Sequence, residues 1–123
     1  MQGRFGDNPE PGSTYQLIWF YDSFHHCVDF RSVVPRLRNM LAPGGRIILA
    51  GEPIESGPGA AVPYPWGVRL HSEVALVMRQ TGWFELGFTE PFLYELFAKS
   101  GFNGRRIDCS ETLFARLHVF DRD

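Results

Sequence analysis

Two apolar segments separated by a helical pattern stand out in the first half of the chain. The segments begin at Tyr15 (YQLIWFY) and at Arg46 (RIILAGE), and neither alternates strictly between apolar and polar residues. Such runs are typical of strands that are buried on both faces of a parallel sheet. Between them, apolar residues recur at helical spacing over 33–41. This arrangement predicts a crossover helix within a right-handed β-α-β unit.

Proline sets the limits of the predicted crossover helix. Pro35 is tolerated in the first helical turn, where its missing N–H has no partner to lose. This favours Ser32 as the N-cap, while Asp29 is the alternative and would require a kink. The Pro-Gly-Gly sequence at 43–45 is predicted to end the helix.

Two further helical patterns lie in the second half of the chain. Ser72 is predicted to cap a helix over 73–81, and Thr89 is predicted to begin another helix that Gly101 ends. The apolar positions of each helix fall on one face, which is typical of helices that pack on a core.

Two stretches rich in proline and glycine are predicted to lack regular structure. Residues 1–14 have turn chemistry and are predicted to form a flexible arm. Residues 53–69 are predicted to form a loop packed onto an exposed core, with a ligand lid as the alternative, since aromatic residues between prolines suit both. Strands are predicted near 105–108 and over 113–120.

Composition and charge exclude several classes of function. The chain has 123 residues and a net charge of −2, so we expect one domain without a surface for nucleic acid. No apolar run is long enough to span a membrane, and no signal-peptide pattern follows Met1. We therefore expect a soluble, cytoplasmic protein whose partners include neither nucleic acid nor a membrane.

The order of these elements resembles the second half of a known family. The opening YQLI of the first strand, the pair His25-His26 after it, and LAPGGRIIL over 41–49 are the features that carry the resemblance. Together they resemble the fourth strand, fourth crossover helix and fifth strand of class I S-adenosylmethionine-dependent methyltransferases. The stretch FLYELFAKSGF over 92–102 is similar to the next helix of that family.

The resemblance implies an α/β fold that is half of a Rossmann-like methyltransferase sheet. Its roughly four strands would have the order 4-5-7-6, with the last strand antiparallel and the helices mainly on one face. We call this unit, residues 1–123, a half-domain. In that strand order Cys27 and Cys109 lie too far apart to form a disulfide, so we expect two free thiols.

The cofactor loop of the family is absent from the sequence. In the family a Gly-rich turn after the first strand lets the backbone approach the methionine part of the cofactor. No such G-x-G occurs here in a strand-turn-helix context. We therefore expect the isolated chain to bind no cofactor, and S-adenosylmethionine to bind only if a complementing N-terminal half is supplied. The resemblance assigns Asp7 and Asn8 as a remnant of the adenine site, with a mobile arm as the alternative.

Polar side chains at the carboxyl ends of the two predicted strands are the candidate site. The resemblance places Asp22, His25 and His26 near the transferred methyl group, and a general base beside a polar rim suits this position. No metal site is predicted, because adjacent histidines are expected to point in different directions. Candidate substrate-binding residues are Glu52, Tyr64, Trp66 and Arg69.

In the family order the fourth strand pairs with the first strand, which belongs to the half of the fold that the resemblance does not cover. Without its neighbour this strand becomes a sheet edge, which exposes unpaired backbone and large side chains at Leu17, Ile18, Trp19, Phe20 and Tyr21. The open sheet face must be covered by the helix over 73–81, by the loop over 53–69, or by a second copy. We expect a homodimer through this edge, or pairing with a complementing N-terminal half.

Two functions of different classes are compatible with the sequence. The first is a self-associating or partner-binding module that cannot bind S-adenosylmethionine or transfer a methyl group alone. The second is a methyltransferase of a small molecule, active as an oligomer or with a complementing half. A weaker similarity of 65–70 and 82–88 to methyltransferase-like domains of surface-polysaccharide genes implies a sugar-like substrate. A product without specific function is the third possibility.

Overall fold

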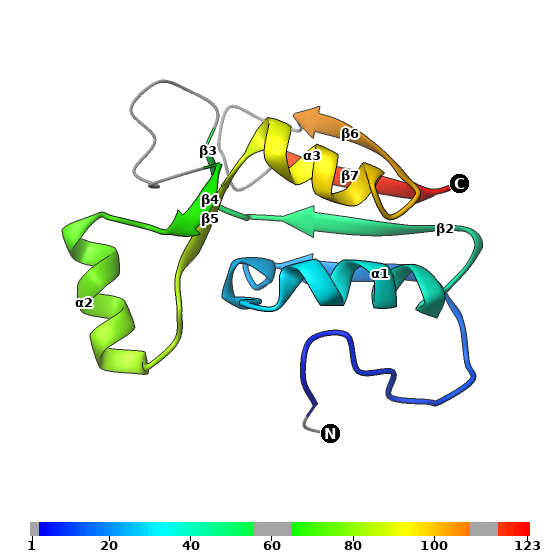
Figure 1. Cartoon of the computed structure of the whole chain (residues 1–123), viewed down its shortest axis with the longest axis horizontal. Helices are drawn as coiled ribbons and strands as arrows, with labels where there is room; N and C mark the ends of the chain where they lie inside the picture. The colour runs from blue at the N-terminus through cyan, green and yellow to red at the C-terminus, as the bar shows by residue number, and fades with distance from the viewer. Residues whose placement is uncertain (1–2, 56–64, 109–115) are drawn as a thin grey trace.

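A four-stranded sheet forms the centre of the protein. A computed structural model describes residues 3–55, 65–108 and 116–123 (Figure 1). The strands have the order β1-β2-β7-β6. β1 runs parallel to β2, whereas β7 is antiparallel to both of its neighbours. This confirms the predicted order 4-5-7-6 with its antiparallel last strand. The bounds are β1 (Tyr15–Tyr21), β2 (Leu41–Ala50), β6 (Phe102–Asp108) and β7 (Arg116–Arg122).

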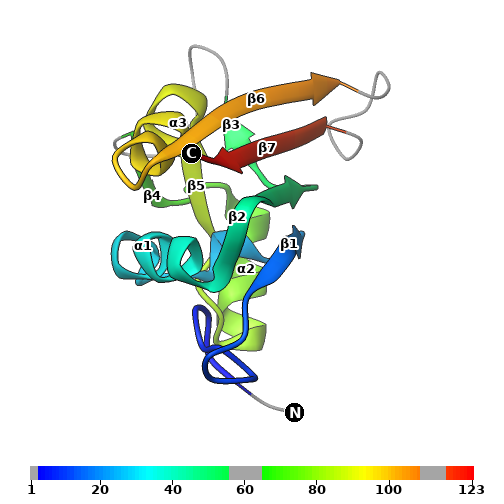
Figure 2. The same ribbon diagram turned by 90° about the vertical axis from the view of Figure 1, so that its right-hand side faces the viewer.

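Helices α1 (Phe30–Met40) and α3 (Glu90–Ala98) cover the same face of this sheet, as Figure 2 shows. The helices therefore lie mainly on one face, as predicted. The core between these layers is rich in aromatic rings, and Phe97 stacks on Phe120 with ring centroids 3.8 Å apart. Each such ring buries a large apolar area and dominates the packing energy of the layer.

Helix α2 (Ser72–Thr81) does not cover the other sheet face. It lies beyond the carboxyl end of β2 and contains no buried residue (Figure 1). Its C-cap is Gly82 in a left-handed conformation, and its N-cap is His71 instead of the predicted Ser72, which is the first residue of the helix. None of the helices in the described ranges has the length and apolar character needed to cross a bilayer.

The crossover helix begins three residues earlier than the favoured prediction. Asp29, not Ser32, is the N-cap of α1, and Pro35 lies inside the helix. The carbonyl of Asp29 accepts the N–H groups of Ser32 and Val33 at 2.9 and 3.0 Å. The early start places Phe30, which is 1% exposed, in the core against the edge of Phe88 at a centroid distance of 5.0 Å. Aromatic burial therefore outweighs the position that proline prefers.

The second strand also begins earlier than expected, at Leu41 instead of Arg46. Residues 43–45, predicted as a helix stop, lie within β2, and the pairing shifts register between Tyr15 and Leu17. A Cβ atom on Gly45 would lie 2.9 Å from the carbonyl oxygen of Ala42, so glycine permits this close approach of backbones.

A second, three-stranded sheet lies at the carboxyl ends of β1 and β2. Its order is β3-β5-β4, with β3 (Ile54–Glu55), β4 (Trp66–Val68) and β5 (Leu86–Thr89). Two of these strands fall within 53–69, which the sequence predicts to be a loop. β5 was not predicted, because four residues containing a glycine give no period. The central residue Phe88 is fully buried.

The carboxyl-terminal elements agree with the sequence more closely. Thr89 is the N-cap of α3, as predicted. β6 begins at Phe102, three residues before the predicted strand, and β7 begins at Arg116; residues 113–115 of the predicted strand lie outside the described residues. Cys27 is buried and forms no disulfide, whereas Cys109 lies outside the described residues. Burial and the nearby carboxylate of Asp29 raise the pKa of the Cys27 thiol to about 11.

The packing of α3 against the sheet leaves little room for a methyl group at Gly104. A Cβ atom on Gly104 would lie 2.7 Å from the ring of Tyr94 and 2.8 Å from that of Phe120. Gly104→Ala should lower the free energy of unfolding by about 1–3 kcal/mol in urea titration, because both rings must shift. The matched control is Gly3→Ala, whose new atom would be 3.7 Å from Asp7. Equal stability of the two variants would contradict this packing.

A buried histidine predicts how stability depends on pH. His118 is 1% exposed, and its Nδ1 lies 3.0 Å from the hydroxyl oxygen of Tyr94. Burial lowers the pKa of His118 and raises the pKa of Tyr94 to about 12, so the hydroxyl donates to a neutral ring. The unfolded chain takes up the proton first as the pH falls. The contribution of neutral His118 to the free energy of unfolding is therefore complete at a pH above its pKa in the unfolded chain. This contribution is lost as the pH falls through the pKa of His118 in the folded chain.

Urea unfolding at pH 7.5 and pH 5 tests this sign. His118→Gln should show a smaller loss of unfolding free energy between the two pH values than the wild type does. An unchanged loss in His118→Gln would show that this histidine is not held neutral. His71→Gln, at an exposed histidine, is the control and should leave the pH dependence unaltered.

Candidate functional site

The two histidines of the sequence lie where the two sheets meet. After β1 the chain turns at Asp22, which has a positive φ of 46°, and enters the 3₁₀ helix η1 (Phe24–His26). Glu52 follows β2, and Glu85 directly precedes β5. These segments bring His25, His26, Glu52 and Glu85 together at the carboxyl ends of the parallel strands, the usual ligand-binding edge of an α/β sheet.

Glu52 holds the η1 turn in place. Its side chain is 1% exposed. Oε1 accepts the backbone N–H groups of Ser23 at 2.9 Å and Phe24 at 2.7 Å. Oε2 lies 3.1 Å from the backbone nitrogen of His25 and 2.7 Å from Nδ1 of the same residue. Both oxygens of Glu52 are occupied by these contacts, which orient His25, so the predicted contact of Glu52 with a substrate stays a prediction.

His25 lies between two carboxylates. Its Nδ1 faces Glu52, and its Nε2 lies 3.0 Å from Oε2 of Glu85. Burial opposes the charge on the ring, but the hydrogen bond and charge of Glu52, followed by the charges of Glu85 and Asp22, outweigh it and raise the pKa of His25. A ring held in this way favours the protonated form, which suits proton donation, and the catalytic role of His25 stays a prediction.

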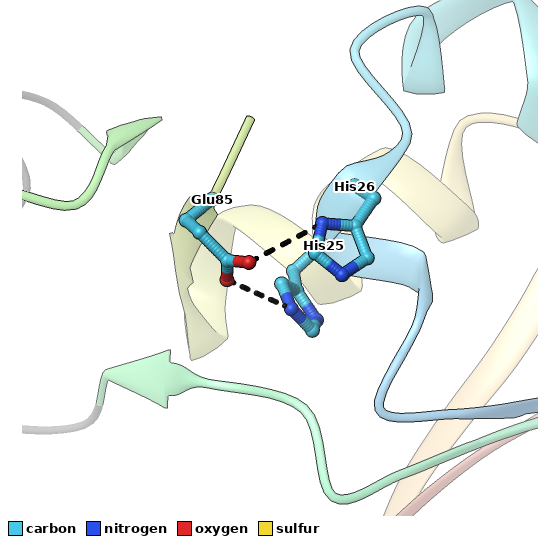
Figure 3. A group of neighbouring side chains, drawn as sticks. All are labelled: His25, His26 and Glu85. Carbon is cyan, nitrogen blue, oxygen red and sulfur yellow. Dashed lines mark ion pairs between the residues drawn. The ribbon is translucent and has the colours of Figure 1, made fainter. Parts of the chain in front are cut away.

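His26 reaches the same carboxylate from the neighbouring position. Its Nδ1 lies 2.8 Å from the carbonyl oxygen of Phe84 and 3.5 Å from Oε1 of Glu85. The two imidazole rings are 4.1 Å apart and both face Glu85 (Figure 3). The expectation that adjacent histidines diverge is wrong, because the 3₁₀ turn directs both rings toward the segment before β5.

The remaining predicted residues do not all lie at this site. A cavity of about 300 Å³ adjoins the histidines and is lined in part by Asp22, Arg69 and Glu73. Nε of Arg69 is buried without a hydrogen-bond partner among the described residues. Trp66 instead packs against Phe30 with ring centroids 5.2 Å apart. Tyr64 lies outside the described residues.

Glu85 is the site residue that sequence reasoning missed. It is a single polar residue in the aromatic stretch WFELGF, which lies between the two helical patterns of the second half of the chain. The available signal was a lone carboxylate among apolar residues, since such a group is rarely placed there without a partner.

A larger cleft of about 700 Å³ lies between the N-terminal segment, β1 and α1. Asp7, a predicted cofactor residue, lines it and accepts the backbone N–H of Arg4 at 2.7 Å. Asn8 is instead part of a turn, where its amide donates to the carbonyl of Ser13 at 3.0 Å and its oxygen accepts the hydroxyl of Tyr15 at 3.0 Å. The cleft volume is within the range of small-molecule sites, and Asp7 lines the cleft whereas Asn8 does not.

Comparison with known proteins identifies the fold. No protein-family model and no curated protein matches the sequence. Solved structures do match. Human N-acetylserotonin methyltransferase in complex with S-adenosylmethionine is 15% identical with a TM-score of 0.66, covering 99% of this chain and 33% of that one. The chain has the fold of the C-terminal part of a class I S-adenosylmethionine-dependent methyltransferase.

Two further structures agree with this methyltransferase-like fold. An O-methyltransferase family protein from Burkholderia thailandensis is 15% identical with a TM-score of 0.63, covering 92% of this chain and 32% of that one. A Haloferax volcanii methyltransferase in complex with a methyltransferase activator is 12% identical with a TM-score of 0.66, covering 98% of this chain and 59% of that one. The chain thus spans about a third of the length of the O-methyltransferase it matches.

The position of Glu52 predicts a strong effect of removing its charge. Glu52→Gln should lower the free energy of unfolding by about 3 kcal/mol, because the variant leaves His25 and three backbone N–H groups facing a poorer acceptor. Urea unfolding at neutral pH measures this loss. Glu73→Gln, an exposed carboxylate beside the same cavity, should change the unfolding free energy by less than about 0.5 kcal/mol. Similar losses in the two variants would contradict the role of Glu52.

Proposed function

We propose that the chain is a methyltransferase-like half-domain that acts through strand pairing, as a self-associating or partner-binding module. By itself it neither binds S-adenosylmethionine nor transfers a methyl group. The observation that carries this proposal is the outer edge of β1. Among the described residues, β1 has a strand neighbour on one side only, and its large apolar side chains on one face are exposed.

The hydrogen bonds of β1 define which groups a partner strand would meet. The N–H of Asp22 donates to the carbonyl of Ala50 in β2 at 2.8 Å. Because backbone groups alternate in direction along a strand, the N–H groups of Leu17 and Trp19 point away from β2. The edge is therefore a row of unpaired donors and acceptors, which favours addition of a further strand.

Side chains of β1 support the same conclusion. Leu17, Trp19 and Tyr21 are 48%, 51% and 62% exposed, whereas the alternate residue Phe20 is buried in the core. Large apolar side chains that stay in water gain free energy when a partner covers them. A twofold axis at β1 would pair this strand with its own copy, giving an eight-stranded sheet in a homodimer.

An enzyme is the second candidate, in which a complementing N-terminal half pairs with β1 in place of a second copy. The large cleft reaches Trp19 at the sheet edge and contains Asp7, so a strand added there would contribute to its wall. S-adenosylmethionine would then lie across the two halves. The cavity with His25 and Arg69 would take a small, sugar-like acceptor whose oxygen atoms could hydrogen-bond to both.

Sedimentation velocity at micromolar concentration tests the module. We expect the mass of a dimer for the wild type, and a dissociation constant at least about tenfold larger for Trp19→Lys, because the substitution places two charges opposite each other at the new strand pair. Trp83→Lys is the control, since Trp83 is 63% exposed but lies outside β1. A wild type that stays monomeric would remove self-association from the proposal.

Calorimetric titration with S-adenosylmethionine separates the two candidates. The isolated chain should give no binding heat. Micromolar affinity of the chain alone for S-adenosylmethionine would refute the proposal that it is a module without a cofactor. Binding that develops only after an N-terminal methyltransferase half is added would instead support the enzyme.

A further inference from the structure

We propose that His25, His26 and Glu85 form a binding site for a divalent metal ion of the zinc class. Nε2 of His25 and Oε2 of Glu85 are 3.0 Å apart, and Nδ1 of His26 and Oε1 of Glu85 are 3.5 Å apart (Figure 3). The ligand atoms of the three residues all lie within 4.8 Å of one another. This site goes beyond the proposed function, which needs no metal.

These separations are close to those of a bound tetrahedral ion. Zinc binds histidine nitrogen and carboxylate oxygen at about 2.0–2.2 Å, which separates the ligand atoms by roughly 3.4 Å. The two distances to Glu85, one to each carboxylate oxygen, lie on either side of this value. The two histidine nitrogens have to approach each other, which small rotations of rings 4.1 Å apart can supply.

The surroundings of His25 match those of histidines that bind metals. A ligating imidazole typically donates its other N–H to a carboxylate, which fixes the tautomer and the ring plane. Nδ1 of His25 makes this bond to Glu52 at 2.7 Å, and Glu52 is itself fixed by backbone N–H groups. Metal binding would release the proton that protonated His25 carries on Nε2 toward Glu85, and the Nε2 lone pair would then face the ion.

The cavity beside the three ligands leaves room for a fourth. Its volume is about 300 Å³, and Asp22, Glu73 and Arg69 also line it. Catalytic zinc sites keep three protein ligands and one open position for water or an oxygen ligand. Here that position would face the cavity, where the guanidinium of Arg69 could hydrogen-bond to the bound oxygen.

Histidine and carboxylate ligands also define the class of ion. Imidazole nitrogen favours zinc and its neighbours among the transition metals over magnesium and calcium, which prefer sites made of oxygen. The alternative is that the same three side chains form a hydrogen-bond network without a metal ion. In that network His26 donates from Nδ1 to the carbonyl of Phe84 at 2.8 Å, whereas metal binding requires the tautomer protonated at Nε2.

Isothermal titration of the whole chain with zinc chloride tests the site. We expect one ion per chain with micromolar or tighter affinity, and visible absorption of tetrahedral Co²⁺ when cobalt replaces zinc. No zinc heat at millimolar concentration, or cobalt spectra of an octahedral aqua ion only, would overturn the proposal.

Variants at two ligands separate the site from non-specific binding. His26→Ala and Glu85→Gln should each weaken zinc binding by at least about tenfold and abolish the tetrahedral cobalt spectrum, with the far-ultraviolet circular dichroism unchanged. His71→Ala and Glu73→Gln, an exposed histidine and a carboxylate of the same cavity, should retain wild-type affinity. Equal losses in ligand and control variants would assign the zinc to surface groups and refute the site.

Discussion

Within the described ranges β1 pairs with β2 alone, and this one-sided pairing is the constraint on which the structure depends. It ends the sheet at β1 and positions the η1 turn at the carboxyl end of the parallel pair. Glu52, immediately after β2, then fixes that turn through backbone N–H groups and the ring of His25. One pair of strands therefore determines both the exposed edge and the geometry of the site.

The edge and the site have different physical characters. The edge is apolar and exposed, so burial of its side chains contributes free energy only when another chain covers them. The site is polar and largely satisfied within the chain, because each oxygen of Glu52 has two nitrogen neighbours and Glu85 faces both histidines. The proposed association at the edge and the proposed binding at the histidine cluster therefore involve different groups of the chain.

The first two strands could be predicted because strand-length apolar runs are local signals, whereas the sheet order was implied by the resemblance to the methyltransferase family. The start of α1 could not, since burial of Phe30 among rings distant in sequence decides it. β5 is too short for a period and exists because Phe88 packs between other elements. Asp22, His25 and His26 were found from their place after β1. The contribution of Glu85 depends on a sheet that no local pattern predicts.

Residue-resolved amide hydrogen exchange at several protein concentrations is the most direct test that β1 is a pairing edge. We expect the amides of Ile18 and Phe20, directed toward β2, to be protected from exchange at every concentration. We expect the amides of Leu17 and Trp19 to exchange rapidly in dilute solution and to become protected as the chains associate. Protection of the Trp19 amide that is equally strong at all dilutions in a monomer would show that β1 is not a pairing edge.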